Sequence, residues 1–247
     1  MCSFKLFAFP VSFLKILYCM ALLNNSPSPN PFHFSSLFHL QTTKKSVQED
    51  IVKKHNQLRR MVFPPGSDLL KMVRAHNRTV AQMWADKCIF EKSPVEFRDM
   101  DLHCGENIFV SEYPLSWSCV IQSWYDKSID YRFGSNILPD EYIQIVWNSS
   151  YTIACGVSKC PDKPLKFMYV CRYCPLGNLL RRLKFPYTVG EPCAQCPDHC
   201  DNGLCTNSCP DADKGAFCAE LKDLHTCGHS RVKFECRATC TCGGKIH

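Results

Sequence analysis

Apolar residues recur at every third or fourth position in the first half of the chain and predict three amphipathic helices. The first is predicted to begin at Ser46, where Ser-Val-Gln-Glu forms a capping box, and to end at the Pro-Pro-Gly sequence of 64–66. The second is predicted over 79–88 and the third over 116–127. Each of these helices has one apolar face, and this face must pack against another layer of the protein.

Strand patterns follow the helices. A continuous apolar run with β-branched residues predicts a strand over 142–147, and two more are predicted over 151–158 and 165–172. The last two are joined by a Pro-Asp-Lys-Pro turn. Helices first and strands later are typical of an α+β fold, in which helices pack on a sheet.

Cysteine is concentrated at the end of the chain. Ten of the 19 cysteines lie within 193–242, where only 217–224 retains helical periodicity. Such density is typical of a small module that is held together by disulfides or by metal. The Cys-x2-Cys pairs at 171–174 and 193–196 leave zinc or redox chemistry open, although a thioredoxin-like motif requires a βαβ setting that is not predicted here.

The N-terminal segment of 1–23 is interpreted as a secretory signal peptide, with a short apolar run after Lys15. The alternative is a leader that is not the physiological one. Residues 24–45, rich in Ser, Pro and Asn, predict a flexible lead-in. No other stretch approaches 18 apolar residues, so no transmembrane segment is predicted and the expected location is secreted and extracellular.

Charge is balanced in the two regions that are expected to fold. Residues 46–174 hold 16 basic and 15 acidic groups, and residues 193–247 hold six basic and seven acidic groups. The overall charge of +6 therefore comes largely from the N-terminal segment and the loop of 175–192. This distribution gives no electrostatic footprint for nucleic acid, and no nucleic-acid partner is expected.

Several motifs stand in a familiar order. They are His-Asn-Gln-Leu-Arg-Arg at 55–60, Cys-Gly-Glu-Asn-Ile at 104–108, Tyr-Ile-Gln-Ile-Val-Trp at 142–147 and Tyr-Val-Cys-Arg-Tyr-Cys-Pro-Leu-Gly-Asn at 169–178. With the cysteine spacing of the tail, they show that the chain resembles the cysteine-rich secretory proteins (CRISPs) from about residue 48 to 246.

The resemblance implies how the chain is divided. It implies a CAP (SCP/PR-1-like) domain, an α-β-α sandwich, over 46–174, then a linker and disulfide-rich hinge over 175–208, and a cysteine-rich module similar to ShK toxins over 209–247. It also implies eight disulfides: Cys88–Cys160, Cys104–Cys174, Cys155–Cys171, Cys193–Cys200, Cys196–Cys205, Cys209–Cys242, Cys218–Cys236 and Cys227–Cys240.

Cys119 has no family partner, and the helical wheel of 116–127 turns it away from the apolar face. We therefore expect a free thiol at Cys119 that is open to capping or to an intermolecular bridge, and a Cys119-linked dimer is one interpretation. The alternative is a tolerated Ser→Cys change without a role.

CAP domains usually carry two histidines and two glutamates in a central cleft, a set that can hold zinc. Aligned by motif, these positions are occupied here by Lys92, Glu106, Lys127 and Glu141. Two ammonium groups beside a divalent cation are unfavourable, so neither zinc nor another cofactor is expected. We hypothesise instead that Glu106 and Glu141 pair with Lys92 and Lys127.

Catalytic signatures are missing from the sequence. It contains no Gly-x-Ser-x-Gly, His-Glu-x-x-His or phosphate-loop motif. His55 lies on an apolar helix face, which favours a core histidine over a base. His103 and Glu106 are close enough in sequence to approach each other, but no nucleophile accompanies them. A non-enzymatic protein is expected.

The resemblance implies a secreted protein that binds a membrane protein at a cell surface, plausibly an ion channel, through its terminal module. Candidate contacts there are Phe217, Lys222, Leu224, Arg231, Lys233 and Phe234, and ordinary surface residues are the equal alternative. Other interpretations are adhesion or recognition on sperm or in the reproductive tract, and lipid or sterol carriage by the CAP domain. Sequons predict glycosylation at Asn77 and Asn148.

Overall fold

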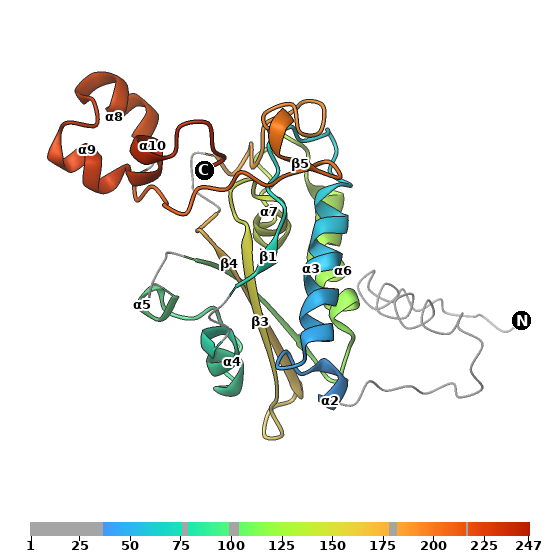
Figure 1. Cartoon of the computed structure of the whole chain (residues 1–247). Helices are drawn as coiled ribbons and strands as arrows, with labels where there is room; N and C mark the ends of the chain where they lie inside the picture. Colours follow the sequence, from blue (N-terminus) through green and yellow to red (C-terminus); the bar gives the residue numbers. More distant parts are fainter. Residues whose placement is uncertain (1–36, 76–78, 99–103, 178–181, 216) are drawn as a thin grey trace, which may run out of the picture.

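A three-layer sandwich forms most of the chain. The computed structural model describes residues 37–75, 79–98, 104–177, 182–215 and 217–247 (Figure 1). A four-stranded sheet lies in the middle, with strands β1 (Val73–Arg74), β2 (Gly105–Ser111), β3 (Thr152–Lys159) and β4 (Phe167–Cys174). The predicted α+β class with an α-β-α sandwich is confirmed, and none of the described helices is long and apolar enough to cross a membrane.

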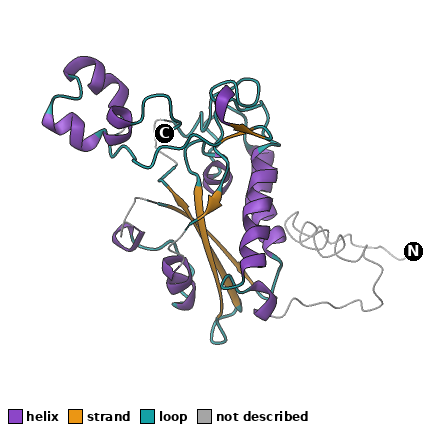
Figure 2. Ribbon diagram, in the orientation of Figure 1, coloured by secondary structure: helices purple, strands orange, loops and turns teal. Residues whose placement is uncertain are grey.

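Helices cover both faces of the sheet (Figure 2). One layer holds α3, α6 and α7, and the other holds α4 and α5. Their bounds are α2 (Leu37–Leu40), α3 (Lys45–Arg59), α4 (Thr79–Asp86), α5 (Val95–Arg98), α6 (Trp117–Tyr125), the 3-10 helix η2 (Asp126–Asp130) and α7 (Asp140–Val146).

The sheet has the order β1-β3-β4-β2, in which β1 and β3 are parallel and the other neighbours are antiparallel. Residues 167–173 of β4 are all buried because helices lie on both faces of the sheet. Gly156 of β3 permits the approach of α4, since a Cβ atom there would lie 2.5 Å from the Cα atom of Gln82.

The fold begins earlier than Ser46. Leu40 of α2 is buried, and the indole nitrogen of Trp117 donates to the Leu40 carbonyl at 2.8 Å. Helix α3 starts at Lys45, and no side chain caps its first turn. The prediction of a flexible lead-in up to residue 45 is therefore wrong for 37–45; residues 1–36, which include the predicted signal peptide, lie outside the described residues.

The strand predicted over 142–147 is wrong, because this segment forms the helix α7. All residues from Tyr142 to Val146 are buried, so an apolar run without alternation carried no information on its period. Buried Arg59 of α3 donates to the carbonyl oxygens of Ile145 and Trp147, both at 2.8 Å. A cation at the C-terminus of a short helix satisfies its last carbonyls and complements its dipole.

Eight disulfides join described residues, and they connect the same pairs that the family resemblance implies. Three lie in the sandwich, two between residues 193 and 205, and three in the terminal module. No bridge connects one of these parts to another within the described chain. Each part is therefore stabilised by its own cross-links, each contributing about 2–4 kcal/mol.

The predictions for Cys119 are wrong. Its side chain is only 9% exposed and belongs to the main core, because α6 also buries Trp117, Val120, Ile121 and Trp124 around a broad arc. Cys119 is disulfide-bonded, so its thiol is not free. A free, outward-facing thiol at this position, and the intermolecular bridge built on it, are therefore withdrawn.

The segment 193–205, called the hinge below, is docked on the sandwich. It contains the 3-10 helix η3 (Pro197–His199) and the strands β5 (Cys200–Asp201) and β6 (Leu204–Cys205). The backbone amide of Lys71 donates to the Cys205 carbonyl at 2.8 Å, and the Cys205 amide donates to the Leu69 carbonyl at 2.8 Å. An ion pair between Lys71 and Asp201 adds a polar contact.

The terminal module stands apart from the sandwich (Figure 1). It consists of α8 (Cys218–His225), α9 (Ser230–Glu235) and α10 (Arg237–Thr241). Its two ends lie together, because Ser208 pairs with Ile246, and Ile246 packs against the cluster of Leu70 and the hinge cysteines. The module is therefore held at two places, by the covalent chain that leads into it and by the packing of Ile246 near its C-terminus.

Candidate functional site

The four positions at which CAP domains usually carry two histidines and two glutamates, called the tetrad below, lie in four different parts of the sandwich. Lys92 follows α4, Glu106 lies on β2, Lys127 on η2 and Glu141 on α7. Glu106 is only 1% exposed, and its two carboxylate oxygens accept hydrogen bonds from the backbone amide of Ser93 at 2.7 Å and from the Ser93 hydroxyl at 2.9 Å. Its carboxylate is thus held by a neutral partner.

Ion pairs replace the tetrad only in part. Lys127 pairs with Glu141, as hypothesised. Lys92 pairs with Asp140, so the predicted pairing of Lys92 with Glu106 is wrong. The reason is local, because Ser93 already satisfies Glu106, and Lys92 is left to reach the exposed start of α7. Both ion pairs are partly exposed and contribute about 0–1 kcal/mol each.

Zinc does not fit this donor set. Two of the four positions are ammonium groups that donate hydrogen bonds, and the Glu106 oxygens are already occupied by Ser93. A divalent ion would have to displace these contacts and would meet two positive charges. The expectation that the cleft holds no metal or cofactor stays a prediction.

His55 is a satisfied core histidine. Its side chain is fully buried, with Nδ1 2.8 Å from the Ile51 carbonyl oxygen and Nε2 3.0 Å from the hydroxyl of Tyr173. Burial, opposed by the backbone hydrogen bond to Ile51 and assisted by the neighbouring charges of Arg59 and Lys54, lowers the pKa of His55 to about 4. The ring is therefore neutral near pH 7 and positions Tyr173 rather than a substrate.

The hinge brings three buried cysteine sulfurs within 4.8 Å of one another, those of Cys193, Cys196 and Cys205. This clustering is the arrangement that the zinc interpretation of the Cys-x2-Cys pair at 193–196 requires, so the bonding state of the three sulfurs decides it. Cys193 is bonded to Cys200, and Cys196 is bonded to Cys205, so none of the three is a thiolate. A metal would require both bridges to be reduced.

Asn148 lies in a buried polar cluster, not on the surface. It is 3% exposed, its amide nitrogen donates to Asp68 Oδ2 at 2.7 Å, and its amide oxygen accepts from Arg182 at 3.1 Å. A glycan attaches to this amide nitrogen and would displace the hydrogen bond to Asp68, which argues against the glycosylation that the sequon predicts at Asn148. Asn77 and His103 lie outside the described residues.

We expect secreted protein from mammalian cells to carry no glycan at Asn148. Peptide mapping of the intact, folded product after enzymatic glycan removal in heavy-oxygen water should leave Asn148 as asparagine, without the mass shift of conversion to aspartate. Asn77 serves as the internal comparison, because the same digest reports both sequons. A converted Asn148 in native protein would contradict the buried hydrogen bonds described above.

The six candidate contacts of the terminal module are all exposed. Leu224 is 74% and Phe234 67% exposed, and Phe217 is 44% exposed. The basic residues are exposed as well, and Lys214 stacks over the Phe234 ring with its Nζ 4.2 Å from the ring centre. The exposed candidates are Phe217, Lys222, Leu224, Arg231, Lys233 and Phe234.

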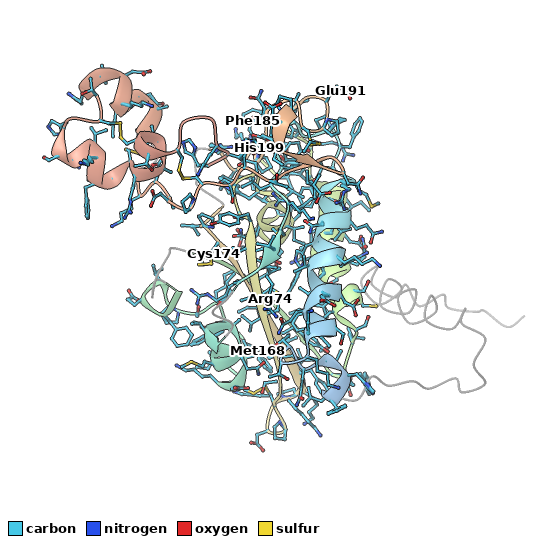
Figure 3. All side chains as sticks on the ribbon, in the orientation of Figure 1. Arg74, Met168, Cys174, Phe185, Glu191 and His199 are labelled. Atoms are coloured by element: carbon cyan, nitrogen blue, oxygen red, sulfur yellow. A yellow bond between two sulfur atoms is a disulfide. The ribbon has the colours of Figure 1, made fainter. Side chains whose placement is uncertain are left out.

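Sequence reasoning missed a groove between α3 and β1. It encloses about 480 Å³ and is bordered by residues of one face of α3 together with residues 71–74 (Figure 3 labels Arg74). The signal was present in α3, where polar residues follow the helical repeat beside the predicted core face. It carried no motif, and the opposing strand β1 is only two residues long.

Two protein-family models match the chain, one over the sandwich and one over the hinge and the terminal module. A family model described as "Cysteine-rich secretory protein family" (CAP) matches residues 52–173, and one described as "Crisp" matches residues 193–247. Cysteine-rich secretory protein 1 of Mus musculus is similar, with 53% identity over 242 residues, 95% of this chain and 97% of that protein.

Two further relatives widen the range of species. Cysteine-rich secretory protein 2 of Homo sapiens is 46% identical over 84% of this chain and 88% of that protein. Cysteine-rich venom protein helothermine of Heloderma horridum horridum is 43% identical over 82% of this chain and 87% of that protein.

Solved structures share the sandwich. The crystal structure of Na-ASP-1 matches with a TM-score of 0.56 and 26% identity over 65% of this chain and 47% of that one. A crystal structure of NaASP2 with Zn²⁺ matches with a TM-score of 0.57 and 24% identity over 66% of this chain and 96% of that one. At this identity the second match shows the fold alone, and its zinc is not carried over.

Proposed function

This chain belongs to the cysteine-rich secretory protein family, and we propose that it is a secreted, non-catalytic binding protein whose terminal module engages a membrane protein at a cell surface. The observation that carries the proposal is the exposure of Leu224 and Phe234 on a small cross-linked module. Exposed apolar residues that gather on one surface mark interaction sites, and we assign this role to Leu224 and Phe234.

The cross-links make these anchors suitable for binding. Cys209–Cys242, Cys218–Cys236 and Cys227–Cys240 hold the three helices of the module. A surface that is already ordered loses little conformational entropy when it binds. The packing of Ile246 against Leu70 and the hinge cysteines further restricts the orientation of the module relative to the sandwich.

A cation channel is the target class that we propose. Lys222, Arg231 and Lys233 are exposed on the helices that carry Leu224 and Phe234. Cation channels commonly present rings of acidic side chains at their entrances. These cations would meet such acidic rings one by one, since Glu220, Asp223 and Glu235 on the same two helices balance their charge. Leu224 and Phe234 would supply affinity and the individual cations orientation.

The cleft of the sandwich supports a non-catalytic role. Within the described residues, its two lysines are ion-paired, its buried glutamate is held by Ser93, and the nearby histidine is enclosed in the core. No described side chain there combines a nucleophile with an accessible base, which hydrolytic chemistry would require.

The test compares the full chain with the double variant Leu224→Ser/Phe234→Ser. We expect block of a responsive cation current by the wild-type protein, and a potency at least about tenfold lower in the double variant, because two anchors are lost. Ile129→Ser is the matched control, since Ile129 is 62% exposed on the sandwich. Equal potency of wild type and double variant would reject the terminal module as the binding surface.

Adhesion or recognition at a cell surface is the second candidate function. It uses the same exposed residues without requiring a pore. Binding of labelled protein to sperm or epithelial cells that is lost in Leu224→Ser/Phe234→Ser, with no change in any recorded current, favours adhesion over channel regulation.

A further inference from the structure

The groove between α3 and β1 carries an unbalanced charge. Its border holds five cationic side chains and one carboxylate: Lys45, Lys53, Arg60, Lys71, Arg74 and Glu49. Glu49 pairs with Lys45 at 3.6 Å, and Lys71 pairs with Asp201 of the hinge. Of the remaining three, Lys53 and Arg74 form no ion pair with a described residue, and Arg74 donates to the Gln48 side chain. Arg60 donates to the Asn202 carbonyl and lies near Asp201, whose pKa its charge helps to lower.

Apolar side chains lie between these charges. Val52 of α3 is partly buried and Val73 of β1 is 44% exposed, and both border the groove. A concave site of a few hundred Å³ that combines apolar walls with a few charged groups is typical of a binding site. A bare polyanion would leave the two valines uncovered.

The strand β1 forms the edge of the sheet at this groove. Val73 donates its amide to the Tyr151 carbonyl at 2.7 Å, and Ala75 donates to the Ile153 carbonyl at 2.9 Å. Successive residues of a strand direct their backbone groups to opposite sides. The amide and carbonyl of Arg74, between these two, therefore face away from β3 and toward the groove.

The amide and carbonyl of Met72 also face away from β3, and they show which kind of group pairs with this edge. The Met72 amide donates to Asn56 Oδ1 at 2.7 Å, and Asn56 Nδ2 donates to the Met72 carbonyl at 2.9 Å. The side-chain amide of Asn56 thus reproduces the pairing that a further strand would make. Helix α3 supplies this substitute at Met72, and Arg74 is the next position along the edge.

We propose that this groove binds an extended, acidic peptide segment of a partner protein, which pairs with the outer edge of β1 at Arg74. Its alternate side chains would lie on Val52 and Val73, and its carboxylates would meet the basic border. Addition of a strand to an exposed sheet edge is a common mode of peptide recognition. This surface lies on the sandwich and does not depend on the function proposed for the terminal module.

The backbone edge distinguishes a peptide from an anionic amphiphile. An acyl chain with an acidic head group would satisfy the cations and cover the valines. It has no donor and acceptor along its length to pair with the Arg74 amide and carbonyl. An extended peptide supplies all three kinds of contact, so the structure favours it.

The test uses the full chain and a fluorescent pool of octapeptides in which Glu alternates with Val, Ile or Thr. We expect binding by anisotropy that weakens with added salt, and an affinity at least about tenfold lower in Lys53→Glu/Arg74→Glu, because two border charges are reversed. Lys159→Glu is the matched control, since Lys159 is exposed at the end of β3 outside the groove. Its affinity should equal that of the wild type.

Two further measurements test the strand pairing. The same pool with alternate backbone nitrogens methylated should bind at least about tenfold more weakly in the methylation register that blocks the edge. Hydrogen exchange of the Arg74 amide should slow when the unmodified pool is bound.

Three results would overturn the proposal. They are equal binding of the acidic pool and a matched lysine pool, equal binding by wild type and Lys53→Glu/Arg74→Glu, and binding of monomeric oleate that depends on Lys53 and Arg74 while the acidic pool does not bind. The last would assign the groove to an anionic amphiphile.

Discussion

Replacing Arg59 with methionine is expected to lower the free energy of unfolding by about 3–5 kcal/mol. The Arg59 side chain is fully buried, and its guanidinium donates to the carbonyl oxygens of Ile145 and Trp147 at 2.8 Å and of Asn148 at 2.9 Å. Methionine fills a similar volume but leaves the buried carbonyls of Ile145 and Trp147 without this donor, while the Asn148 carbonyl still accepts from the Leu70 amide at 3.0 Å. The predicted loss of unfolding free energy therefore measures how much the Arg59 hydrogen bonds stabilise the contact between α3 and the end of α7.

Urea denaturation with the disulfides intact measures this effect. Arg60→Met is the matched control, because Arg60 is the exposed neighbour on the same helix end and donates only to the Asn202 carbonyl. We expect Arg60→Met to cost less than about 1 kcal/mol. If the two variants are equally stable, the buried Arg59 contacts do not hold α7 in place.

Acidification from pH 7 to pH 4 is expected to remove up to about 3 kcal/mol of stability through His55 alone. The folded pKa of about 4 lies below the ordinary value of 6.5, chiefly because burial disfavours the charged ring. The stability is therefore fully present above pH 6.5. It is lost as the pH falls toward 4, because the unfolded chain binds the proton first.

The His55→Gln variant isolates this contribution. Its unfolding free energy is expected to be lower than that of the wild type at pH 7 and to fall less steeply between pH 6.5 and pH 4. The comparison of the two slopes removes the contribution of carboxylates, which both proteins share. Parallel slopes would show that His55 does not titrate in this window, contrary to its enclosure by Ile51 and Tyr173.

The sequence predicted those parts of the fold in which the spacing of apolar residues matches the spacing of buried positions. Helices α3, α4 and α6 each bury one stripe, and β3 and β4 lie next to a Pro-Asp-Lys-Pro turn that separates them. The helical state of α7 was not predicted, because every residue from Tyr142 to Val146 is buried. The exposed polar positions that would reveal a helical spacing are therefore missing. The helical state of α7 depends on tertiary contacts, above all on Arg59.

The remaining differences from the sequence-based expectations share a different cause, which is that local patterns do not report distant partners. The sequon at Asn148 is a valid short motif, but Asp68 and Arg182 from other parts of the chain bury it. The helical wheel placed Cys119 outside because it assumed a narrow apolar face. Likewise, the short helices of the terminal module depend on disulfides more than on a regular apolar stripe.

The central claim is that cross-links hold the terminal module in the conformation that binds a cell surface. It is tested most directly by comparing cell binding of two variants of the full chain that each lack one bridge. Cys218→Ser/Cys236→Ser removes the bond between α8 and the end of α9, and Cys88→Ser/Cys160→Ser removes one in the sandwich. We predict that the first variant loses binding while the second, still folded by circular dichroism, retains it. Retained binding in the first variant, or loss only in the second, would contradict the account.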